Sequence, residues 1–389
     1  MKKLFLGAFV LFCCAAAVEA GFNLGMLSAV KSQSQNLDIA VANKKASNGS
    51  SYLGNVPPGM GSGPITFSTA PVAAGDFLWI VSLGNLNPPG HTLPTDHIYF
   101  YYADPAVENS WQKTFSIYAP ANGVITELLY QPSQVAGGLG DYKVTIVFSN
   151  TFGCYFDHVT MLDNAIASQA GTVSSNNTQE TSENIPVKAG QRIGMGGNEI
   201  GTFAFDLGVD NLELTLPFIN PAHYHQSTVN ADAPLKYFAE PIKSALYAKV
   251  TRYGSDKDGK VCYDVPGRLI GGWFLTGAGP DDWSEQMAFA YDAVYSTYVM
   301  VSCGGTLGIT GTCRVQDGAI PPENISTATG PYGYQFQSWD PSTGNIVSSI
   351  PRGLLMVQMI DDNTIKVEYF PDNTGTTMPF DANAKIYVR

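Results

Sequence analysis

Short runs of aromatic and β-branched residues, each ended by glycine, proline or asparagine, recur along this sequence and favour a mainly β fold. Examples are residues 76–83 (DFLWIVSL), 142–148 (YKVTIVF) and 296–302 (STYVMVS). Strands favour these residue types, whereas Gly and Pro mark turns. The chain holds 40 Gly and 24 Pro in 389 residues, with 12% aromatics, so it is rich in turn residues and in strand-favouring residues. A chain of this length predicts two domains.

The first twenty residues have the pattern of a secretory signal peptide. Lys2 and Lys3 precede an apolar stretch at 4–17, and Val18-Glu19-Ala20 places small residues at a cleavage site after Ala20. We therefore predict export to the periplasm or the extracellular space. No later run reaches the roughly 18 apolar residues of a transmembrane helix, so we predict no membrane span.

Charge and cysteine content narrow the possible partners. The formal net charge is -12 and Lys and Arg form no cluster, which argues against nucleic-acid binding.

Four cysteines follow the signal sequence, an even number that suggests disulfides in an exported protein. Cys303 and Cys313 bracket a Gly-rich turn and are the predicted pair. The sequence does not indicate an oligomeric state.

The stretch 88–102, PPGHTLPTDHIYFYY, carries two of the five histidines. It reads as a loop that delivers His91, Asp96 and His97 to the start of an aromatic strand. Such a loop either forms part of a functional site or is only the connection that leads into a strand. Because adjacent strand residues point to opposite faces, Asp96 need not touch His97, nor Asp157 the following His158.

Further elements follow in a defined order. Residues 119–125 (APANGVI) predict a tight hairpin, because Asn-Gly precedes a β-branched return. Residues 142–159 form a strand, a turn and a second strand that contains His158. Residues 187–194 (VKAGQRIG) predict a turn between short strands, and 201–209 (GTFAFDLGV) predict an alternating strand.

This order resembles the M23 (lysostaphin-like) zinc metallopeptidases, which cut peptidoglycan cross-bridges. The resemblance covers roughly residues 75–215. It rests on 119–125, on 142–159 with His158 at the family's lone histidine, and on 187–194. It implies a peptidase-like antiparallel β domain.

The metal-ligand positions depart from the family pattern. With His97 as the histidine of the first motif, Tyr101 stands where the family has Asp, and Phe203 and Phe205 stand at the final His-x-His. Since zinc needs three protein donors, this alignment implies no cofactor. We therefore expect a non-catalytic, degenerate peptidase that binds peptidoglycan, another glycan or a protein partner. Its expected binding cleft contains His91, Asp96, His97, Tyr101, His158, Phe203 and Phe205.

Two alternatives stay open. In the first, zinc is retained in an active metallohydrolase, with His91 or Asp96 as a displaced ligand or with a new His-x-His at His223 and His225. The metal candidates are then His97, His158, His223 and His225. In the second alternative, the protein is a structural or interaction protein in which the histidines have no role.

The predicted organisation is a signal peptide (1–20), an N-terminal segment and linker (21–64), the M23-like β domain (65–233), a connecting segment (234–249) and a C-terminal domain (250–389). About seven short strands in the last part predict a small β-barrel or β-sandwich. Pro241 fits the start of a short helix in the connecting segment. No histidine follows His225, which argues against nucleophile–base chemistry in the C-terminal domain.

Overall fold

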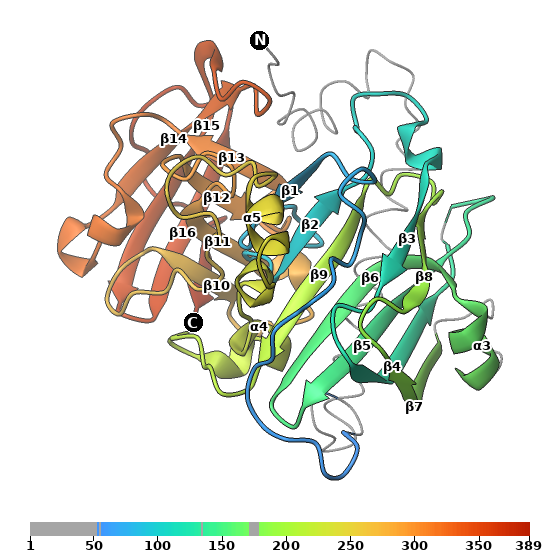
Figure 1. The fold of residues 1–389 in the computed structure, drawn as a ribbon. Helices are drawn as coiled ribbons and strands as arrows, with labels where there is room; N and C mark the ends of the chain where they lie inside the picture. The colour runs from blue at the N-terminus through green and yellow to red at the C-terminus, as the bar shows by residue number, and fades with distance from the viewer. Residues whose placement is uncertain (1–52, 54–55, 134, 171–178) are drawn as a thin grey trace.

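The protein folds into a large antiparallel sheet and a closed β-barrel, which stand side by side in Figure 1. The computed structural model describes residues 53, 56–133, 135–170 and 179–389. The mainly β fold class is thereby confirmed, with a barrel as the C-terminal unit. The predicted signal peptide and most of the predicted segment 21–64 lie outside the described residues. No helix in the described part of the chain is long and apolar enough to cross a membrane.

Nine strands form the first unit, and all of their pairings are antiparallel. The main order is β1-β2-β9-β6-β5-β4-β7, while β8 pairs with β6 and β3. The strands are β1 (Trp79–Val81), β2 (His97–Tyr101), β3 (Thr114–Tyr118), β4 (Gly123–Gln131), β5 (Asp141–Ser149), β6 (Phe152–Leu162), β7 (Gln179–Val187), β8 (Arg192–Gly197) and β9 (Ala204–Asn211).

Alternation along β2 and β9 separates a core face from a polar face. Ile98 and Phe100 of β2 and Phe205 of β9 are 2% exposed or less and belong to the core of this unit. Their neighbours, among them His97 and Asp206, point the other way because the side-chain period of a strand is two. That second face is the one that the barrel approaches.

The predicted hairpin at 119–125 is wrong. Residues 119–122 do connect β3 to β4, but β3 pairs with β8, whereas β4 pairs with β5 and β7. The turn residues therefore carry the chain from one layer of strands to another. Local turn chemistry favours a reversal of the chain, and only the distant partner strands decide which edges pair.

Short helices join the two units. They include α4 (Gln226–Val229) and α5 (Ile242–Tyr247), with Pro241 at the predicted position before the first turn of α5. A further helix, α3 (Asn164–Ala170), follows β6. After α5 the chain runs beside β1: the N–H of Ile80 donates to Lys249 O at 2.9 Å, and the N–H of Thr251 to Ile80 O at 3.0 Å. These bonds place the start of the barrel at the β1–β2 edge of the sheet.

Eight strands close the barrel, with β10 paired to both β11 and β17. The strands are β10 (Gly271–Leu275), β11 (Gln286–Tyr291), β12 (Val299–Cys303), β13 (Gly311–Val315), β14 (Tyr332–Trp339), β15 (Ile346–Asp361), β16 (Thr364–Pro371) and β17 (Lys385–Val388). Large side chains, including Trp273, Phe289 and Tyr334, fill its interior. A Cβ on Gly272 would collide with the hydroxyl of Tyr224, so this glycine lets the segment between β9 and α5 pack on β10.

The predicted Cys303–Cys313 disulfide is wrong. The four cysteines within the described residues are not joined to one another. Cys303 is opposite Gly311, and Cys313 is opposite Val301, so the two cysteines are diagonal neighbours on β12 and β13. Diagonal Cα atoms lie about 7–8 Å apart, beyond the usual span of a disulfide.

Candidate functional site

A bulge in β6 creates the centre of the site. Tyr142 of β5 pairs with Val159 and Val144 pairs with Phe156, so the single residue Lys143 stands opposite two residues, Asp157 and His158. His158 has a positive φ of 65°, which is uncommon for a residue other than glycine. The extra residue breaks the alternation, and both Asp157 and His158 line the same cavity.

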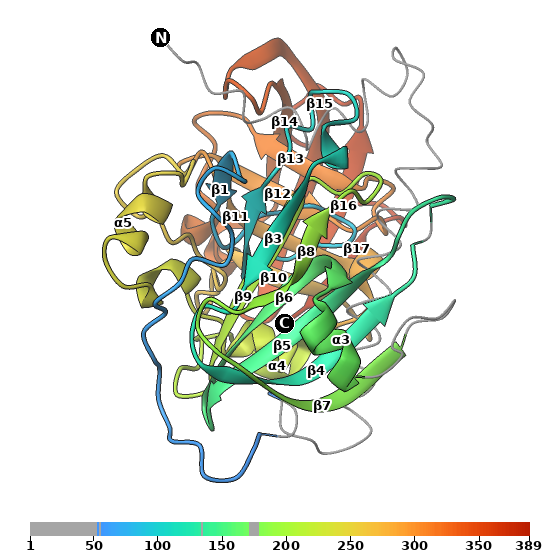
Figure 2. The ribbon, with the colours of Figure 1, turned by 45° about the vertical axis from the view of Figure 1, so that its right-hand side comes forward.

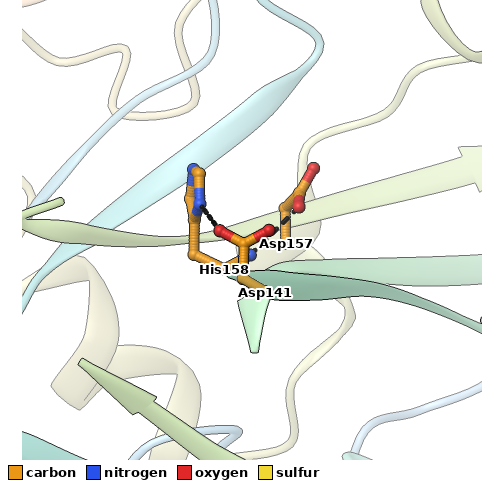
Figure 3. A group of neighbouring side chains, drawn as sticks. All are labelled: Asp141, Asp157 and His158. Atoms are coloured by element: carbon orange, nitrogen blue, oxygen red, sulfur yellow. Dashed lines mark hydrogen bonds and ion pairs between the residues drawn. The ribbon is translucent and has the colours of Figure 1, made fainter. Parts of the chain in front are cut away.

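His158 is held by carboxylates. Its Nδ1 lies 2.7 Å from Oδ2 of Asp141 at the start of β5, and its backbone N–H donates to Oδ1 of Asp157 at 3.0 Å (Figure 3). Burial works to lower the pKa of His158, but Asp141, Asp206 and Asp157 together raise it above its usual value. Burial raises the pKa of Asp157. The bulge therefore places a fixed imidazole among several buried acids.

His97 has a similar arrangement at the start of β2. Its Nδ1 lies 3.0 Å from Oδ1 of Asp96 and 3.1 Å from the hydroxyl of Tyr155. Tyr155 also donates to Asp96 at 2.9 Å, and the hydroxyl of Thr228 from α4 donates to Oδ2 of Asp96 at 2.8 Å. Burial opposes ionisation of Asp96, but His97, Thr228 and Lys143 outweigh it and hold its pKa below the usual range. Asp96 thus contacts its neighbour His97, a contact that the alternation of strand side chains did not require.

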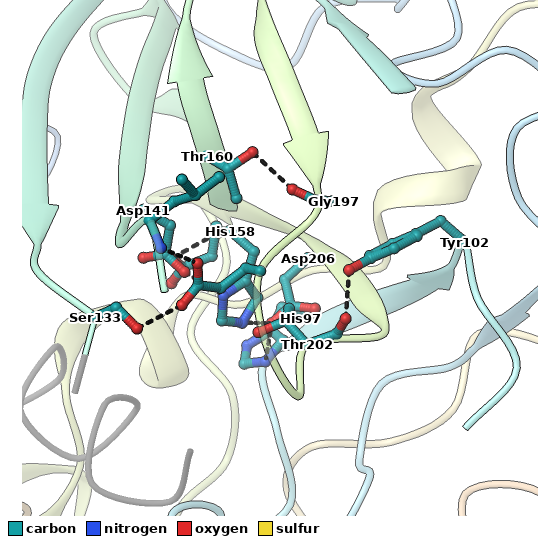
Figure 4. Close-up of polar contacts among 12 residues, drawn as sticks. His97, Tyr102, Ser133, Asp141, His158, Thr160, Gly197, Thr202 and Asp206 are labelled. Atoms are coloured by element: carbon teal, nitrogen blue, oxygen red, sulfur yellow. Dashed lines mark hydrogen bonds and ion pairs between the residues drawn. The ribbon is translucent and has the colours of Figure 1, made fainter. Parts of the chain in front are cut away.

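Asp206 of β9 links the two histidines. Its Oδ2 lies 3.5 Å from Nε2 of His97 and 3.6 Å from Nε2 of His158. Figure 4 shows the three side chains gathered where β2, β6 and β9 meet. Asp206 is 5% exposed, and burial raises its pKa although both histidines lower it. The two histidines thus meet across one carboxylate.

A cavity of about 110 Å³ opens beside these residues, between the sheet and the barrel. We call it the interdomain cleft. A water needs roughly 10–15 Å³ on this measure, so the cleft has room for several waters or a small polar group. The first unit and the segment between β9 and α5 line it with residues that include His91, Asp96, His97, Lys143, Tyr155, Asp157, His158, Asp206, His223, His225 and Thr228, and the barrel adds Pro280, Trp283 and Gln286.

The barrel is tied to the site loop and to α4. The hydroxyl of Thr92 donates to the carbonyl of Trp283 at 3.0 Å. Nε2 of His225, at the start of α4, lies 3.1 Å from Oδ1 of Asp281. Helix α4 also carries Thr228, whose hydroxyl donates to Asp96, and Asp96 in turn contacts His97. The barrel residue Asp281 is therefore linked through α4 to the residues that hold His97. The cleft is therefore a joint product of both units.

His91 is part of the cleft but is held by its backbone. Its N–H and C=O both bond to Asn87, at 3.0 and 2.8 Å, as expected for a loop residue. Its ring packs edge-on against His97 at 5.2 Å and lies 6.5 Å from the ring of Tyr99. Burial and the neighbouring His97 lower the pKa of His91 to about 3, so this imidazole is neutral.

His223 and His225 face different partners in this fold. His223 ends a short 3-10 turn and His225 precedes α4, so neither residue lies on a strand. His225 faces Asp281, whereas the ring of His223 packs edge-on against Phe274 of the barrel at 4.8 Å. The spacing placed them on one face only on the assumption of a strand. Both nevertheless line the interdomain cleft.

Three expected cleft residues lie elsewhere. Phe205 is fully buried in the core, against Phe156 at 5.3 Å. Phe203 is partly buried and packs on the same core, and Tyr101 stacks on Trp79 at 5.4 Å. The position that faces the two histidines on β9 is Asp206, one residue further along the chain than the alignment placed it. A one-residue shift on a strand exchanges its two faces, so this alignment put a core residue in the site.

Sequence reasoning did not assign Asp141, Asp157, Asp206 or Lys143 to the site. Asp141, Asp157 and His158 bring one ligand atom each within 4.8 Å of one another, and Asp206 and Lys143 lie beside them. The alternating pattern of 201–209 held a usable signal for Asp206, because Phe205 and Leu207 mark the core face. The β6 bulge that brings in Asp157 had no such signal.

Comparison with known proteins gives partial likenesses only. No protein-family model and no curated protein matches the sequence. A chain of the SpoIIQ–SpoIIIAH pore-forming complex aligns with 46% of this chain and 96% of its own length, at 12% identity and a TM-score of 0.27. Lysostaphin aligns with 74% of this chain and 84% of its own length, at 13% identity and a TM-score of 0.19. With both TM-scores below 0.5, neither likeness assigns this chain a family, a ligand or a partner.

Proposed function

We propose that this protein is exported and binds a polar group of a cell-envelope polymer, peptidoglycan or another glycan, in the interdomain cleft, without turning it over. One observation carries the proposal: the cleft is lined from both units and combines converging polar groups with an aromatic wall. Small-molecule sites have this character and occur preferentially between domains. Trp283 supplies the aromatic wall, and its indole suits the apolar face of a sugar.

The polar side of the cleft suits a ligand with several hydroxyl or amide groups. Asp96, Asp157 and Asp206 offer acceptors, and Lys143 offers a donor. These groups are buried and held by neighbours, so little side-chain ordering opposes binding. The signal sequence and the resemblance of 75–215 to M23 peptidases support an envelope polymer as the ligand.

Sedimentation with insoluble peptidoglycan and titration with soluble glycan fragments test the proposal. We expect the full chain to bind and its tryptophan fluorescence to change. In Trp283→Phe the fluorescence change should be lost and the binding weakened. Trp111→Phe is the matched control, because Trp111 lies in a short 3-10 turn before β3 and does not line the cleft. Absence of binding to any envelope polymer, or equal binding by the two variants, would refute the proposal.

Hydrolysis of the same polymer is the second candidate function, favoured by one specific observation. Asp206, a possible metal ligand, faces the cleft where the alignment had placed Phe205. A zinc ion held there would act as a Lewis acid and lower the pKa of a bound water. Chromatography of soluble fragments released from peptidoglycan, with and without added zinc, separates the two functions: release that requires zinc selects hydrolysis.

A further inference from the structure

Four flat side chains form a row where the chain enters the barrel, and we call this row the tyrosine stack. The ring of Tyr253 stacks on Tyr295 at a centroid distance of 5.1 Å, and Tyr295 stacks on Tyr298 at 5.0 Å with an interplanar angle of 8°. The guanidinium of Arg314 on β13 lies 3.8 Å from the centroid of Tyr298. Tyr253 ends the row and is 59% exposed, so its ring offers a flat apolar face to solvent.

Neighbouring residues hold the tyrosine stack in place. The N–H of Tyr253 donates to Val294 O at 2.8 Å. The ring of Trp339 packs edge-on against Tyr295 at 5.9 Å. A Cβ on Gly344 would collide with the ring of Tyr295, so the connection between β14 and β15 packs directly on the stack. Because these rings are already ordered, a ligand that stacks on Tyr253 would lose little free energy in ordering side chains.

A second aromatic pair lies on the sheet beside the tyrosine stack. Trp79 of β1 is directly opposite Tyr101 of β2, and their rings stack at 5.4 Å. Both rings are partly buried and pack against a small cluster that contains Ala293 of the barrel. Ala293 directly precedes Val294, the backbone partner of Tyr253. The aromatic pair and the tyrosine stack therefore border the same connection between β11 and β12.

Strand β2 joins this region to the interdomain cleft. His97, Tyr99 and Tyr101 are alternate residues of β2, so their side chains share one face of the strand. His97 lines the cleft, and Tyr101 stands roughly 14 Å further along β2, at about 3.4 Å per residue. The cleft, at about 110 Å³, has room only for a small group. The remainder of a polymer held in the cleft must therefore lie outside it, within reach of the aromatic rings.

The chemistry of this surface suits a sugar chain. The weakly positive C–H groups on the apolar face of a sugar ring match the negative face of an aromatic ring. Asp256, three residues after Tyr253, has a side chain that is 59% exposed and can accept hydrogen bonds from sugar hydroxyls. The formal net charge of -12 disfavours a strongly anionic polymer such as a nucleic acid.

We propose that Tyr253, Trp79 and Tyr101 form an aromatic platform that binds further sugar rings of a glycan chain, as a second contact surface beyond the interdomain cleft. The inference rests on the proposed function, because the same chain places a polar group in the cleft. Two separate contacts with one chain act as linked sites, so affinity rises with chain length once a chain reaches both of them.

The test is calorimetric titration of the full chain with the hexasaccharides of chitin and of cellulose, and with the corresponding disaccharides. Tyr253→Ala and Trp79→Leu remove a ring of the platform, whereas Tyr253→Phe retains it. Trp283→Phe alters the cleft. Ile360→Ala is the matched control, because Ile360 is similarly exposed, at 51%, but lies at the opposite end of β15 from Gly344. Circular dichroism of each variant confirms folding.

We expect the wild type to bind a hexasaccharide more tightly than the disaccharide. Tyr253→Ala and Trp79→Leu should each lower the affinity for the hexasaccharide by roughly 3- to 10-fold and leave that for the disaccharide unchanged. Tyr253→Phe and Ile360→Ala should bind like the wild type. Trp283→Phe should weaken binding of both lengths.

The possible results separate the platform from the cleft. Equal hexasaccharide affinities of Tyr253→Ala and the wild type, with weakened binding by Trp283→Phe, would overturn the platform and leave the proposed function standing. Weakened binding by Tyr253→Ala, with none by Trp283→Phe, would support the platform and refute binding in the cleft. Absence of binding to every saccharide would overturn both. Dimerisation of the wild type that Tyr253→Ala abolishes would assign the surface to a second copy of the chain and overturn the platform.

Discussion

Replacement of Phe205 by alanine tests the register of β9, on which the description of the cleft depends. In the structure this ring is fully buried, and the rings of Phe156, Phe100 and Phe115 surround it at centroid distances of 5.3, 5.9 and 6.0 Å. Truncation of such a side chain loses its burial and leaves a cavity, at a cost of about 3–5 kcal/mol. For a unit of this size, that cost lowers the melting temperature by roughly 6–20 °C.

The assay is thermal and urea unfolding of Phe205→Ala, followed by circular dichroism, with binding of the envelope polymer measured on the folded protein. Phe203→Ala is the matched control, because that ring is only partly buried, and its loss should cost well under half as much. Binding of the polymer should be retained in both variants. A loss below about 1 kcal/mol for Phe205→Ala, combined with loss of polymer binding, would show that Phe205 faces the cleft and that our register is wrong.

Three further predictions concern other parts of the molecule. Glu199 is fully buried, and its two oxygens accept from the Leu139 N–H and the Ser133 hydroxyl, each at 2.6 Å. Glu199→Ala should leave both donors without this partner, cost about 1–3 kcal/mol and speed hydrogen exchange at Leu139; unchanged exchange would contradict this. Burial lowers the pKa of His223, so the unfolded chain takes up a proton there before the folded one does. Stability should therefore fall as pH drops below about 6.5 and level off below the folded pKa, and His223→Gln should remove this component; a difference in melting temperature between variant and wild type that is equal at about pH 8 and about pH 5 would argue against it. The mass of the proteolytic peptide that carries Cys303 and Cys313 should not change on reduction, and a gain in mass would reveal the disulfide that the structure lacks.

The strands were the part of the fold that the sequence predicted well. The run 142–148, for example, lies within β5, because alternation and turn residues are local signals. The closed barrel was one of two predicted alternatives for the C-terminal unit. Pairing was harder, because the partner of β3 is β8, more than seventy residues further along the chain. Which edges meet depends on contacts that no local pattern encodes.

The candidate site could be predicted only in part. His91, Asp96, His97 and His158 all line one cleft. Asp206 was assigned to the wrong face by a single-residue shift of the alignment. The bulge that turns Asp157 toward the cleft is a feature of strand pairing, and neither the residue types nor their spacing indicate it. The contribution of the barrel also lay beyond the sequence, because it depends on how the two units pack.

The shared wall of the interdomain cleft has a thermodynamic consequence. A ligand that touches Asp206 on one side and Trp283 on the other binds only when the two units are docked. Its binding free energy then stabilises the docked arrangement of the two units as well as the folded state of each unit. At a free concentration 100 times its Kd, such a ligand would add about 2.7 kcal/mol to the docked state. The ligand and the barrel would therefore bind cooperatively to the sheet. Occupancy of a cleft of about 110 Å³ would then determine how firmly the two units are held together.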